Sequence, residues 1–208
     1  MAETGPDLAR EAAIGGRVAG LDEVGRGAWA GPLVAAAVVL DPVRVPRGIA
    51  DSKTLAPARR TALAEEIGAV AIVGLGSVEP AEIDAMGLTA ANDLAMVRAL
   101  AALRLRPEAA LVDGRRVPHG LDLPAEAVIR GDALSLSIAA ASIVAKVARD
   151  ATMARLAAEF PDYGWDGSKG YGTARHLDAL TRHGPTPHHS RRFRPIADLL
   201  HKESSIVL

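Results

Sequence analysis

The chain has 208 residues, a formal net charge of −1 and no cysteine. That length fits one large domain, or one domain with a small C-terminal appendage. The lack of cysteine excludes disulfides, thiolate metal sites and a cysteine nucleophile. Hydrophobic residues make up 49% of the chain and aromatic residues only 3%, so we expect a core of Ala, Val, Leu and Ile.

The sequence predicts no targeting or membrane segment. The first fifteen residues carry three acids and no long apolar stretch, so we expect no signal peptide. No uninterrupted window of about 18 apolar residues occurs, so we expect no membrane span. A cytoplasmic protein is therefore expected.

Charge is unevenly distributed. The segment from Gly167 to Lys202 carries a formal charge of +5, which leaves −6 for the rest of the chain. A basic C-terminal region beside an acidic body suits a polyanion held against a carboxylate metal site, although a solvated helical tail would show the same charge. The chain has 20 Arg but only four Lys. Three of these, Lys53, Lys146 and Lys169, fall inside the motifs below, where we expect that a compact point charge is needed.

In the first half of the chain, the apolar pattern predicts strands separated by helices. Predicted strands cover Arg17–Leu21, Leu33–Leu40 and Ala69–Val78. A helix is predicted over Pro57–Ile67, with its proline in the first turn. One or two helices follow over Pro80–Leu105, broken near Gly87 and stopped by Pro107.

The second half alternates in the same way. Short apolar runs predict strands over Ala109–Val112 and Ala127–Arg130, and helices are predicted over Ser135–Phe160 and Thr173–His183. This order indicates an α/β fold with a mixed central sheet flanked by helices. Composition and charge both change near Phe160, which predicts a domain over residues 1–160 and a basic helical C-terminal region over residues 161–208.

Four acids share one position relative to the predicted strands. Asp22, Glu23, Asp113 and Asp132 each follow an apolar run and lie at or beside a glycine turn. Strand ends in an α/β sheet converge on one crevice, so these acids can gather there. Clustered carboxylates raise each other's pKa unless a cation neutralises them, and oxygen ligands suit Mg²⁺ or Mn²⁺. The pattern favours a metal site over exposed turn acids.

The adjacent acids Asp22 and Glu23 raise a geometric question. Neighbouring residues on a regular strand point to opposite faces, so both can face one site only if the chain bends directly after them. Gly25 and Gly27 follow and permit such a bend.

With these residues assembled, the chain resembles the ribonuclease HII family, the type 2 ribonucleases H. The segment GLDEVGRGAWAGPLVAAAVVL is similar to that family's DE-x-GRG-x-x-AGP signature. The segments DSKTL, LVDGRRVP, GDALSLSIAAASIVAKVARD and FPDYGWDGSKGYGT follow in the family's order. The resemblance runs from about Val18 to Ile196. It implies a ribonuclease H-like fold with a small helical C-terminal extension that completes the substrate groove.

The resemblance also implies roles for residues. The four acids would be the catalytic metal ligands for two divalent ions, Mn²⁺ or Mg²⁺. Gly25, Arg26 and Gly27 would contact the ribonucleotide and its 2′-OH, and Tyr171 would stack on the sugar of the neighbouring deoxynucleotide. Family enzymes cut the RNA strand of RNA–DNA hybrids and cut 5′ of a single ribonucleotide in duplex DNA. Those nucleic acids are the expected partners of a monomer that does not bind membranes.

Further side chains are candidates for contacts to phosphate. Lys53 lies in DSK, Ser142 and Lys146 share one helix face at i, i+4, and Lys169 precedes Gly-Tyr. For Ser142, close helix packing is an equal alternative. Tyr171 is flanked by glycines, so we expect it to be presented to solvent.

Three departures from the family pattern affect only phosphate contacts. Leu134 stands where many relatives have Lys, Ser168 where His or Asn is common, and HHSRRF differs in order from HRRSF. We expect Trp29 and Trp165 to pack in the core.

Three alternatives remain open from the sequence. The fold could serve another nuclease, such as a DNA resolvase, but a Gly-Arg-Gly beside Asp-Glu is needed only where a ribose is sensed. A non-catalytic duplex-binding module gives no reason for four acids that would repel phosphate. A zinc site at His183, His188 and His189 has no repeated ligand spacing to support it.

Overall fold

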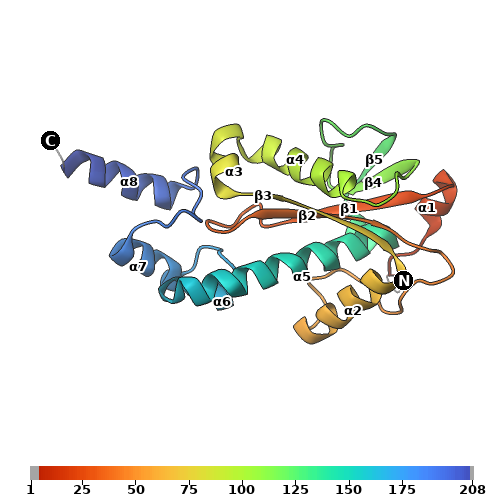
Figure 1. Cartoon of the computed structure of the whole chain (residues 1–208), viewed down its shortest axis with the longest axis horizontal. Coiled ribbons are helices and arrows are strands. Elements are labelled where there is room, and N and C mark those ends of the chain that lie inside the picture. The colour runs from red at the N-terminus through yellow and green to blue at the C-terminus, as the bar shows by residue number, and fades with distance from the viewer. Residues whose placement is uncertain (1–4, 207–208) are drawn as a thin grey trace.

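The computed structural model describes residues 5–206, with a five-stranded sheet between two groups of helices (Figure 1). The strand order is β3-β2-β1-β4-β5. The strands are β1 (Val18–Val24), β2 (Leu33–Val39), β3 (Ile72–Val78), β4 (Ala109–Asp113) and β5 (Ala125–Val128). Strand β2 runs antiparallel to β1 and β3, whereas β4 runs parallel to β1 and β5. This confirms the predicted mixed sheet.

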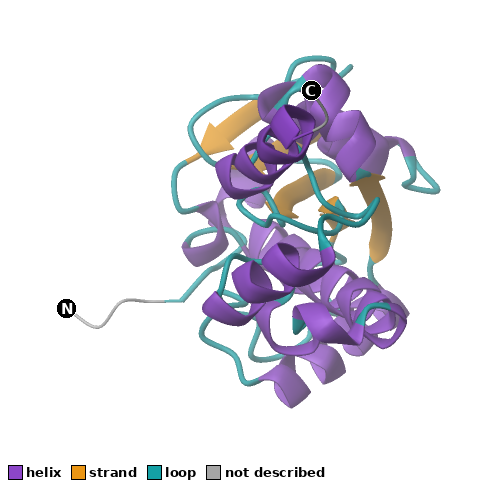
Figure 2. Ribbon diagram, turned by 90° about the vertical axis from the view of Figure 1, so that its left-hand side faces the viewer, coloured by secondary structure: helices purple, strands orange, loops and turns teal. Residues whose placement is uncertain are grey.

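Helices cover both faces of the sheet (Figures 1 and 2). Helices α3 and α4 lie on one face, and α5 lies on the other with α2 packed beside it. The helices are α1 (Ala9–Ile14), α2 (Pro57–Val70), α3 (Pro80–Met86), α4 (Leu88–Ala101), α5 (Leu136–Glu159), α6 (Trp165–Ser168), α7 (Ala174–His183) and α8 (Arg194–Ile206). Two 3₁₀ turns, η1 (Gly131–Ala133) and η2 (Pro161–Tyr163), complete the described elements.

Strand β2 explains why its sequence is a continuous apolar run. All seven of its residues are buried, because alternate side chains enter the hydrophobic clusters on the two faces of the sheet. Ala35 and Ala37 pack with Met96 on the α4 side, whereas Ala36 and Val38 pack with α5 and α2.

Helix α5 lies unusually close to β1. A Cβ on Gly20 would lie 2.1 Å from the carbonyl carbon of Ser137, so only glycine at this position allows the helix to approach the strand. The approach places the N-terminal half of α5, which carries Ser142, against the end of β1, where the first two predicted acids lie.

A third hydrophobic cluster joins the two sides of the predicted boundary near residue 160. Met153 and Leu156 of α5 pack with Trp165, Leu180 and Ile196. Trp165 is fully buried, as expected. The C-terminal region therefore shares a core with the rest of the molecule, and its independence as a domain stays a prediction.

Some element limits differ from the sequence prediction. Helix α2 continues through Val70, past the point where the pattern predicts a strand from Ala69. It does so because Leu63 and Ile67 bury one helix face while Gly68 faces open space. Strand β5 begins two residues earlier than predicted. Gly87 separates α3 from α4, as predicted.

Three of the described helices have no counterpart of their own among the predicted elements, and one of them is the four-residue α6. The short α1 precedes β1, and α8 extends away from the sheet beyond α7 (Figure 1). Among the residues that the structure describes, no helix has the length and apolar character needed to cross a membrane.

Candidate active site at the carboxyl ends of three strands

Parallel pairing brings two of the predicted acids together. In the β1–β4 pair, Leu21 lies opposite Val112, so Asp22 and Asp113, which come next, lie at the same end of the two strands. Strand β5 runs parallel to β4 and ends opposite Asp113. The turn after β5 carries Asp132, and the N–H of Gly131 in that turn donates a 2.7 Å hydrogen bond to Oδ1 of Asp113.

Asp22 and Glu23 approach this edge from opposite faces of the sheet. Asp22 is buried and accepts a hydrogen bond from Ser142 of α5. Glu23 lies on the α4 side, where it lines a small cavity of about 70 Å³ with Asn92. The bend that the sequence predicts directly after Glu23 is wrong by one residue, because pairing with β2 continues to Val24. Both side chains therefore keep the alternation of a regular strand.

Although Asp22 and Glu23 lie on opposite faces of the sheet, the four carboxylates are close enough to affect one another's charge. Burial, then Asp113 and Glu23, raise the pKa of Asp22 well above its usual range. Burial and Asp113 also raise the pKa of Glu23, and the same two causes raise that of Asp132. Asp113 is thus the common neighbour of the other three acids. Such mutual repulsion is what a bound cation relieves.

The donor set fits a hard divalent ion that substrate and water help to hold. All four candidate ligands are carboxylates, the type that Mg²⁺ and Mn²⁺ prefer. Among the described residues, no three His, Asp or Glu side chains are arranged so that they could hold a metal ion by themselves. Mg²⁺ needs no such cage, since it keeps several waters and binds through few carboxylates plus substrate phosphate.

Asp22 is hydrogen-bonded to one of a pair of buried serines that contact each other. The Oγ atoms of Ser52 and Ser142 lie 2.8 Å apart in a buried position, and Ser142 also bonds Asp22. Arg60 of α2 donates a 2.8 Å hydrogen bond to the carbonyl of Ser52, which holds the DSK loop in place. The hydroxyl of Ser142 is thus engaged inside the protein, and its predicted phosphate contact stays a prediction. Ser52 and Arg60 were not predicted from sequence.

Lys53 brings a positive charge to the rim of the acid group. Its Nζ lies 3.8 Å from Oδ2 of Asp132, on a side chain that is 81% exposed. Burial acts to lower the pKa of Lys53, but Asp132 and Asp51 outweigh it and raise the pKa. Asp51 also contributes to the raised pKa of Asp132. It is therefore a fifth nearby acid, which the sequence pattern missed because it follows no strand.

The other two predicted lysines are held by neighbours. Lys146 Nζ lies 2.7 Å from Oδ1 of Asp150, one turn further along α5. Lys169 Nζ donates a 2.5 Å hydrogen bond to the carbonyl of Asp166. Contacts from either lysine to substrate phosphate stay predictions.

The Gly-Arg-Gly turn follows β1 directly and lies beside Tyr171. Gly25 adopts φ +98°, and its carbonyl accepts a 3.1 Å hydrogen bond from the N–H of Ala28, which closes the turn. Arg26 is exposed and acts to lower the pKa of Glu23. A Cβ on Gly27 would lie 3.7 Å from Cε1 of Tyr171. The tyrosine is 39% exposed, in agreement with its predicted presentation to solvent.

A buried histidine pair supports the backbone at Tyr171. His176 Nδ1–H donates a 3.0 Å hydrogen bond to the carbonyl of Tyr171, and its Nε2 accepts from Trp165 and lies 2.9 Å from Nε2 of His189. His189 Nδ1 accepts from the N–H of Thr186. Both nitrogens of His189 are therefore engaged within the protein rather than directed at a zinc ion. The sequence singled out His189 but not His176.

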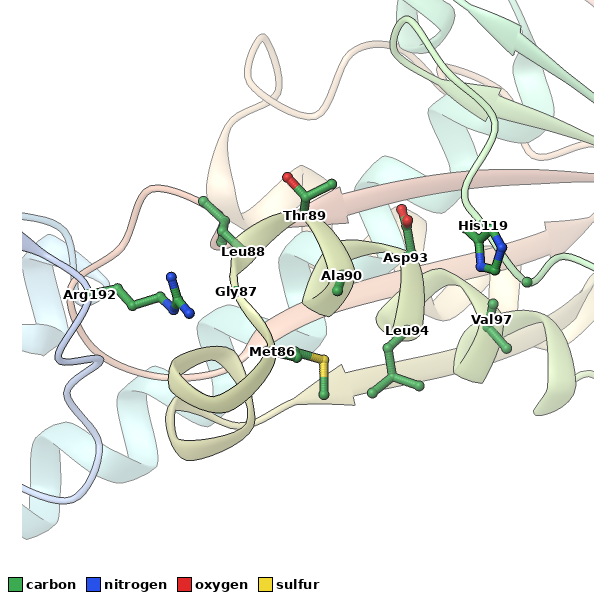
Figure 3. Close-up of a pocket in the computed structure, with 11 residues that line it drawn as sticks. Met86, Gly87, Leu88, Thr89, Ala90, Asp93, Leu94, Val97, His119 and Arg192 are labelled. Carbon is green, nitrogen blue, oxygen red and sulfur yellow. The ribbon is translucent and has the colours of Figure 1, made fainter.

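Arg116 is another residue that no sequence pattern indicated. Its guanidinium pairs with both carboxylate oxygens of Asp93. That pairing raises the pKa of Arg116, and Glu23 adds a smaller contribution in the same direction. Asp93 also lines a larger pocket of about 730 Å³ at the start of α4 (Figure 3). In that view, Arg192 of the C-terminal segment points toward Gly87.

The departures from the family pattern lie outside the acid group. Leu134 is 44% exposed, so it offers an apolar side chain to solvent. In the HHSRRF segment, Ser190 Oγ donates a 2.6 Å hydrogen bond to Oδ1 of Asp84 on α3. This bond attaches the segment to α3.

Comparison with known proteins decides between the open alternatives. The ribonuclease HII family model matches residues 19–196. The chain belongs to the ribonuclease HII family. It is 55% identical over 196 residues to a ribonuclease HII of Jannaschia sp., with 94% of this chain and 98% of that protein covered. A ribonuclease HII of Paramagnetospirillum magneticum is also 55% identical, over 199 residues.

The fold agrees with this membership. The crystal structure of ribonuclease H2 from Pyrococcus horikoshii matches with a TM-score of 0.77 and 27% identity, covering 89% of this chain and 98% of that one. The α/β ribonuclease H-like fold is thereby confirmed. As a ribonuclease HII family member, the protein is an endonuclease that hydrolyses phosphodiester bonds and acts on RNA–DNA hybrids. The resolvase and the non-catalytic binding module are set aside.

Proposed function

We propose that this enzyme nicks duplex DNA on the 5′ side of a single embedded ribonucleotide, in addition to cutting RNA–DNA hybrids. One observation carries the proposal: the turn beside the acids brings Gly27 next to Tyr171, so that a Cβ on the glycine would lie 3.7 Å from Cε1 of the ring. A backbone without a side chain can approach a sugar closely, and the exposed ring can stack on the next sugar. The pair therefore suits a junction between a ribonucleotide and DNA.

Recognition of the ribonucleotide depends on its 2′-OH, which both donates and accepts hydrogen bonds. The tight turn at Gly25 and Gly27 presents backbone groups for that purpose, and the exposed guanidinium of Arg26 is placed to hold a phosphate. Lys53 lies at the rim of the acid group, where its ammonium group can contact the phosphate next along the strand.

The four acids would hold two divalent ions, Mg²⁺ or Mn²⁺. When bound, such ions activate a water and stabilise the leaving oxygen of an in-line displacement at phosphorus. The role of the protein is to orient the carboxylates: Ser142 orients Asp22, and the N–H of Gly131 orients Asp113. The raised pKa values of three of the acids support a site whose charge balance needs cations.

Water is the nucleophile in this proposal, and the 2′-OH is only recognised. The water oxygen forms a bond to phosphorus while the bond from phosphorus to the 3′ oxygen of the preceding deoxynucleotide breaks. The leaving oxygen takes up a proton, so the products carry a 3′-hydroxyl and a 5′-phosphate. We also propose that the protein acts as a monomer in the cytoplasm, with the basic C-terminal region along one side of the substrate groove.

The experiment uses three labelled duplexes: one with a single ribonucleotide, one all-DNA control and one RNA–DNA hybrid. With Mg²⁺ or Mn²⁺, we expect one nick 5′ of the ribonucleotide, several cuts in the hybrid and none in DNA. At the nick, a phosphatase should remove a phosphate from the 5′ end of the downstream fragment. A ligase should reseal the nick only while that phosphate is present. Cutting of the hybrid with no nick at the single ribonucleotide, or a 2′,3′-cyclic phosphate product, would contradict the proposal.

A further inference from the structure

Arg149 lies in the middle of α5 and is fully buried. Its guanidinium donates hydrogen bonds to three backbone carbonyls: 2.8 Å from Nε to Pro32, 2.9 Å from Nη1 to Lys169 and 3.1 Å from Nη2 to Ala30. A buried cation is costly unless its donors are satisfied, and backbone oxygens satisfy them here. The side chain thus links two separate backbone segments to α5.

These segments are the two that carry the proposed ribose contacts. Ala30 and Pro32 close the loop that begins with the Gly-Arg-Gly turn, and Lys169 comes two residues before Tyr171. The two segments also bond each other, since the N–H of Trp29 donates a 2.9 Å hydrogen bond to the carbonyl of Gly170. Nothing in the sequence pattern indicated that a helix residue joins them.

The guanidinium also lies directly against Tyr171 and against Gly25 of the Gly-Arg-Gly turn. Its Cζ lies 5.6 Å from the centroid of the Tyr171 ring, within the range of a cation–π interaction. A Cβ on Gly25 would lie 2.3 Å from Nε of Arg149. The first glycine of the turn is therefore required, at least in part, because the guanidinium occupies the space that a side chain would need.

We propose that Arg149 is a positioning residue that fixes the Gly-Arg-Gly turn and the Tyr171 ring relative to each other. By doing so it sets how strongly the enzyme prefers a single ribonucleotide in DNA to a long hybrid. This inference rests on the proposed function, in which the turn and Tyr171 contact the nucleotides on the two sides of the junction between ribonucleotide and DNA.

The chemistry of arginine suits this role better than that of lysine. A planar guanidinium presents five donors in a fixed fork, so it can hold three carbonyls at set angles, whereas an ammonium is a point charge on a flexible stem. A buried charge is a weak source of stability. Its value at this place is the fixed geometry that it adds to the backbone hydrogen bonds between the two segments.

The test compares kcat and KM of wild type and Arg149→Met on the single-ribonucleotide duplex and on the long hybrid. Methionine keeps an unbranched side chain in the core and removes the three hydrogen bonds. We expect the ratio of kcat/KM for the two substrates to fall by about tenfold, as is common when a group that orients site residues is lost. A merely structural role would lower both values equally and leave the ratio unchanged. Arg155→Met, at an exposed position on the same helix, is the matched control and should keep the ratio.

A double-mutant cycle locates the effect. If Arg149 acts through the ring, Arg149→Met should change the substrate ratio less than about twofold in a Tyr171→Ala background. Full additivity of the two substitutions would overturn the inference. Amide hydrogen exchange of residues 169–171 gives a readout independent of activity, and it should be faster in Arg149→Met than in the control.

Two outcomes separate this inference from the proposed function. If the wild type does not nick the single-ribonucleotide duplex, the proposed function fails. If the wild type nicks it and a folded Arg149→Met keeps the wild-type ratio, only the role of Arg149 fails. Should Arg149→Met not fold, Arg149→Lys carries the test: it keeps the charge but loses the fork, so its ratio should fall by a smaller factor. An unchanged ratio in folded Arg149→Lys would also overturn the inference.

Discussion

The N–H of Gly131 donates a 2.7 Å hydrogen bond to Oδ1 of Asp113. This bond joins the end of β4 to the turn that carries Asp132, so two of the four acids are held as one unit. A Cβ on Gly131 would lie 3.2 Å from that same oxygen and 2.5 Å from Cδ1 of Ile138. The glycine is thus required for the acid at the centre of the group to sit where it does.

Gly131→Ala should therefore reduce activity through the position of Asp113. Because the added methyl contacts both the carboxylate and α5, we expect a loss of about 10- to 100-fold in kcat/KM, as for other groups that orient metal ligands. Steady-state kinetics on the hybrid measures it. Gly68→Ala is the control, since its Cβ would meet open space on α2. Equal activity in the two variants would show that Asp113 keeps its working position when residue 131 carries a side chain.

Ser142→Ala removes the hydroxyl that bonds Asp22 and leaves Ser52 without its partner. Losing a buried hydrogen bond of this kind costs about 1–3 kcal/mol, and we expect weaker metal binding and a loss of about tenfold or more in kcat. Titration of activity with Mn²⁺ measures both effects. Ser77→Ala, at an exposed position on β3, should behave as wild type. If Ser142→Ala raised only KM for nucleic acid, the hydroxyl would be a substrate contact instead.

Divalent ions should stabilise the folded protein. An ion that binds only the folded state adds about 2.7 kcal/mol at a hundredfold excess over its Kd, and the repulsion among the acids makes such binding favourable. Thermal unfolding with and without Mg²⁺ or Mn²⁺ measures the shift in Tm. Asp113→Asn should reduce the shift and, without metal, should unfold at a higher temperature than wild type because it removes the shared repulsion. A shift in Asp113→Asn as large as in wild type would place the ion elsewhere.

The buried histidines predict a pH dependence of stability. Burial lowers the pKa of His176, and burial together with His176 lowers the pKa of His189 to about 4. The unfolded chain binds these protons near pH 6.5, so between about 6.5 and about 4 the unfolded state holds more protons than the folded state. The free energy of unfolding is therefore fully retained above about pH 6.5 and falls as the pH is lowered through that window.

Urea unfolding at about pH 7.5 and about pH 5 measures this effect. His189→Gln should be less stable than wild type at the higher pH and should lose less stability on acidification. His119→Gln, at an exposed position, should keep the wild-type dependence. A wild-type slope in His189→Gln would mean that other groups cause the acid sensitivity.

The sequence predicted those parts of the fold that depend on local pattern. Strand β2 is visible as a continuous apolar run, and the break between α3 and α4 is visible as a glycine. Both features are present in the structure. The end of α2 was missed because an exposed Gly68 resembles a helix stop but costs the helix little. The bounds of α8 were missed, since the sequence pattern predicts only a basic helical region over residues 161–208 and does not divide it there.

The site was predictable only where its residues follow strands. Acids at strand ends can be found because parallel strands share an edge. Arg149 and Ser52 escaped prediction because their roles depend on long-range contacts, with Pro32 and Ser142 respectively. Asp51 escaped it because it lies in a loop whose approach to Asp132 depends on how α2 packs against α5.

The proposed function requires that acids from separate strand ends act together as one cation-dependent hydrolytic site. The activity of the variant Asp22→Asn tests this requirement. The variant should bind the single-ribonucleotide duplex with near wild-type affinity, yet nick it at least about 10³-fold more slowly in Mg²⁺ or Mn²⁺. Asp178→Asn, which changes an exposed acid on α7, should nick at the wild-type rate. Robust nicking by folded Asp22→Asn would show that hydrolysis does not depend on this group of acids.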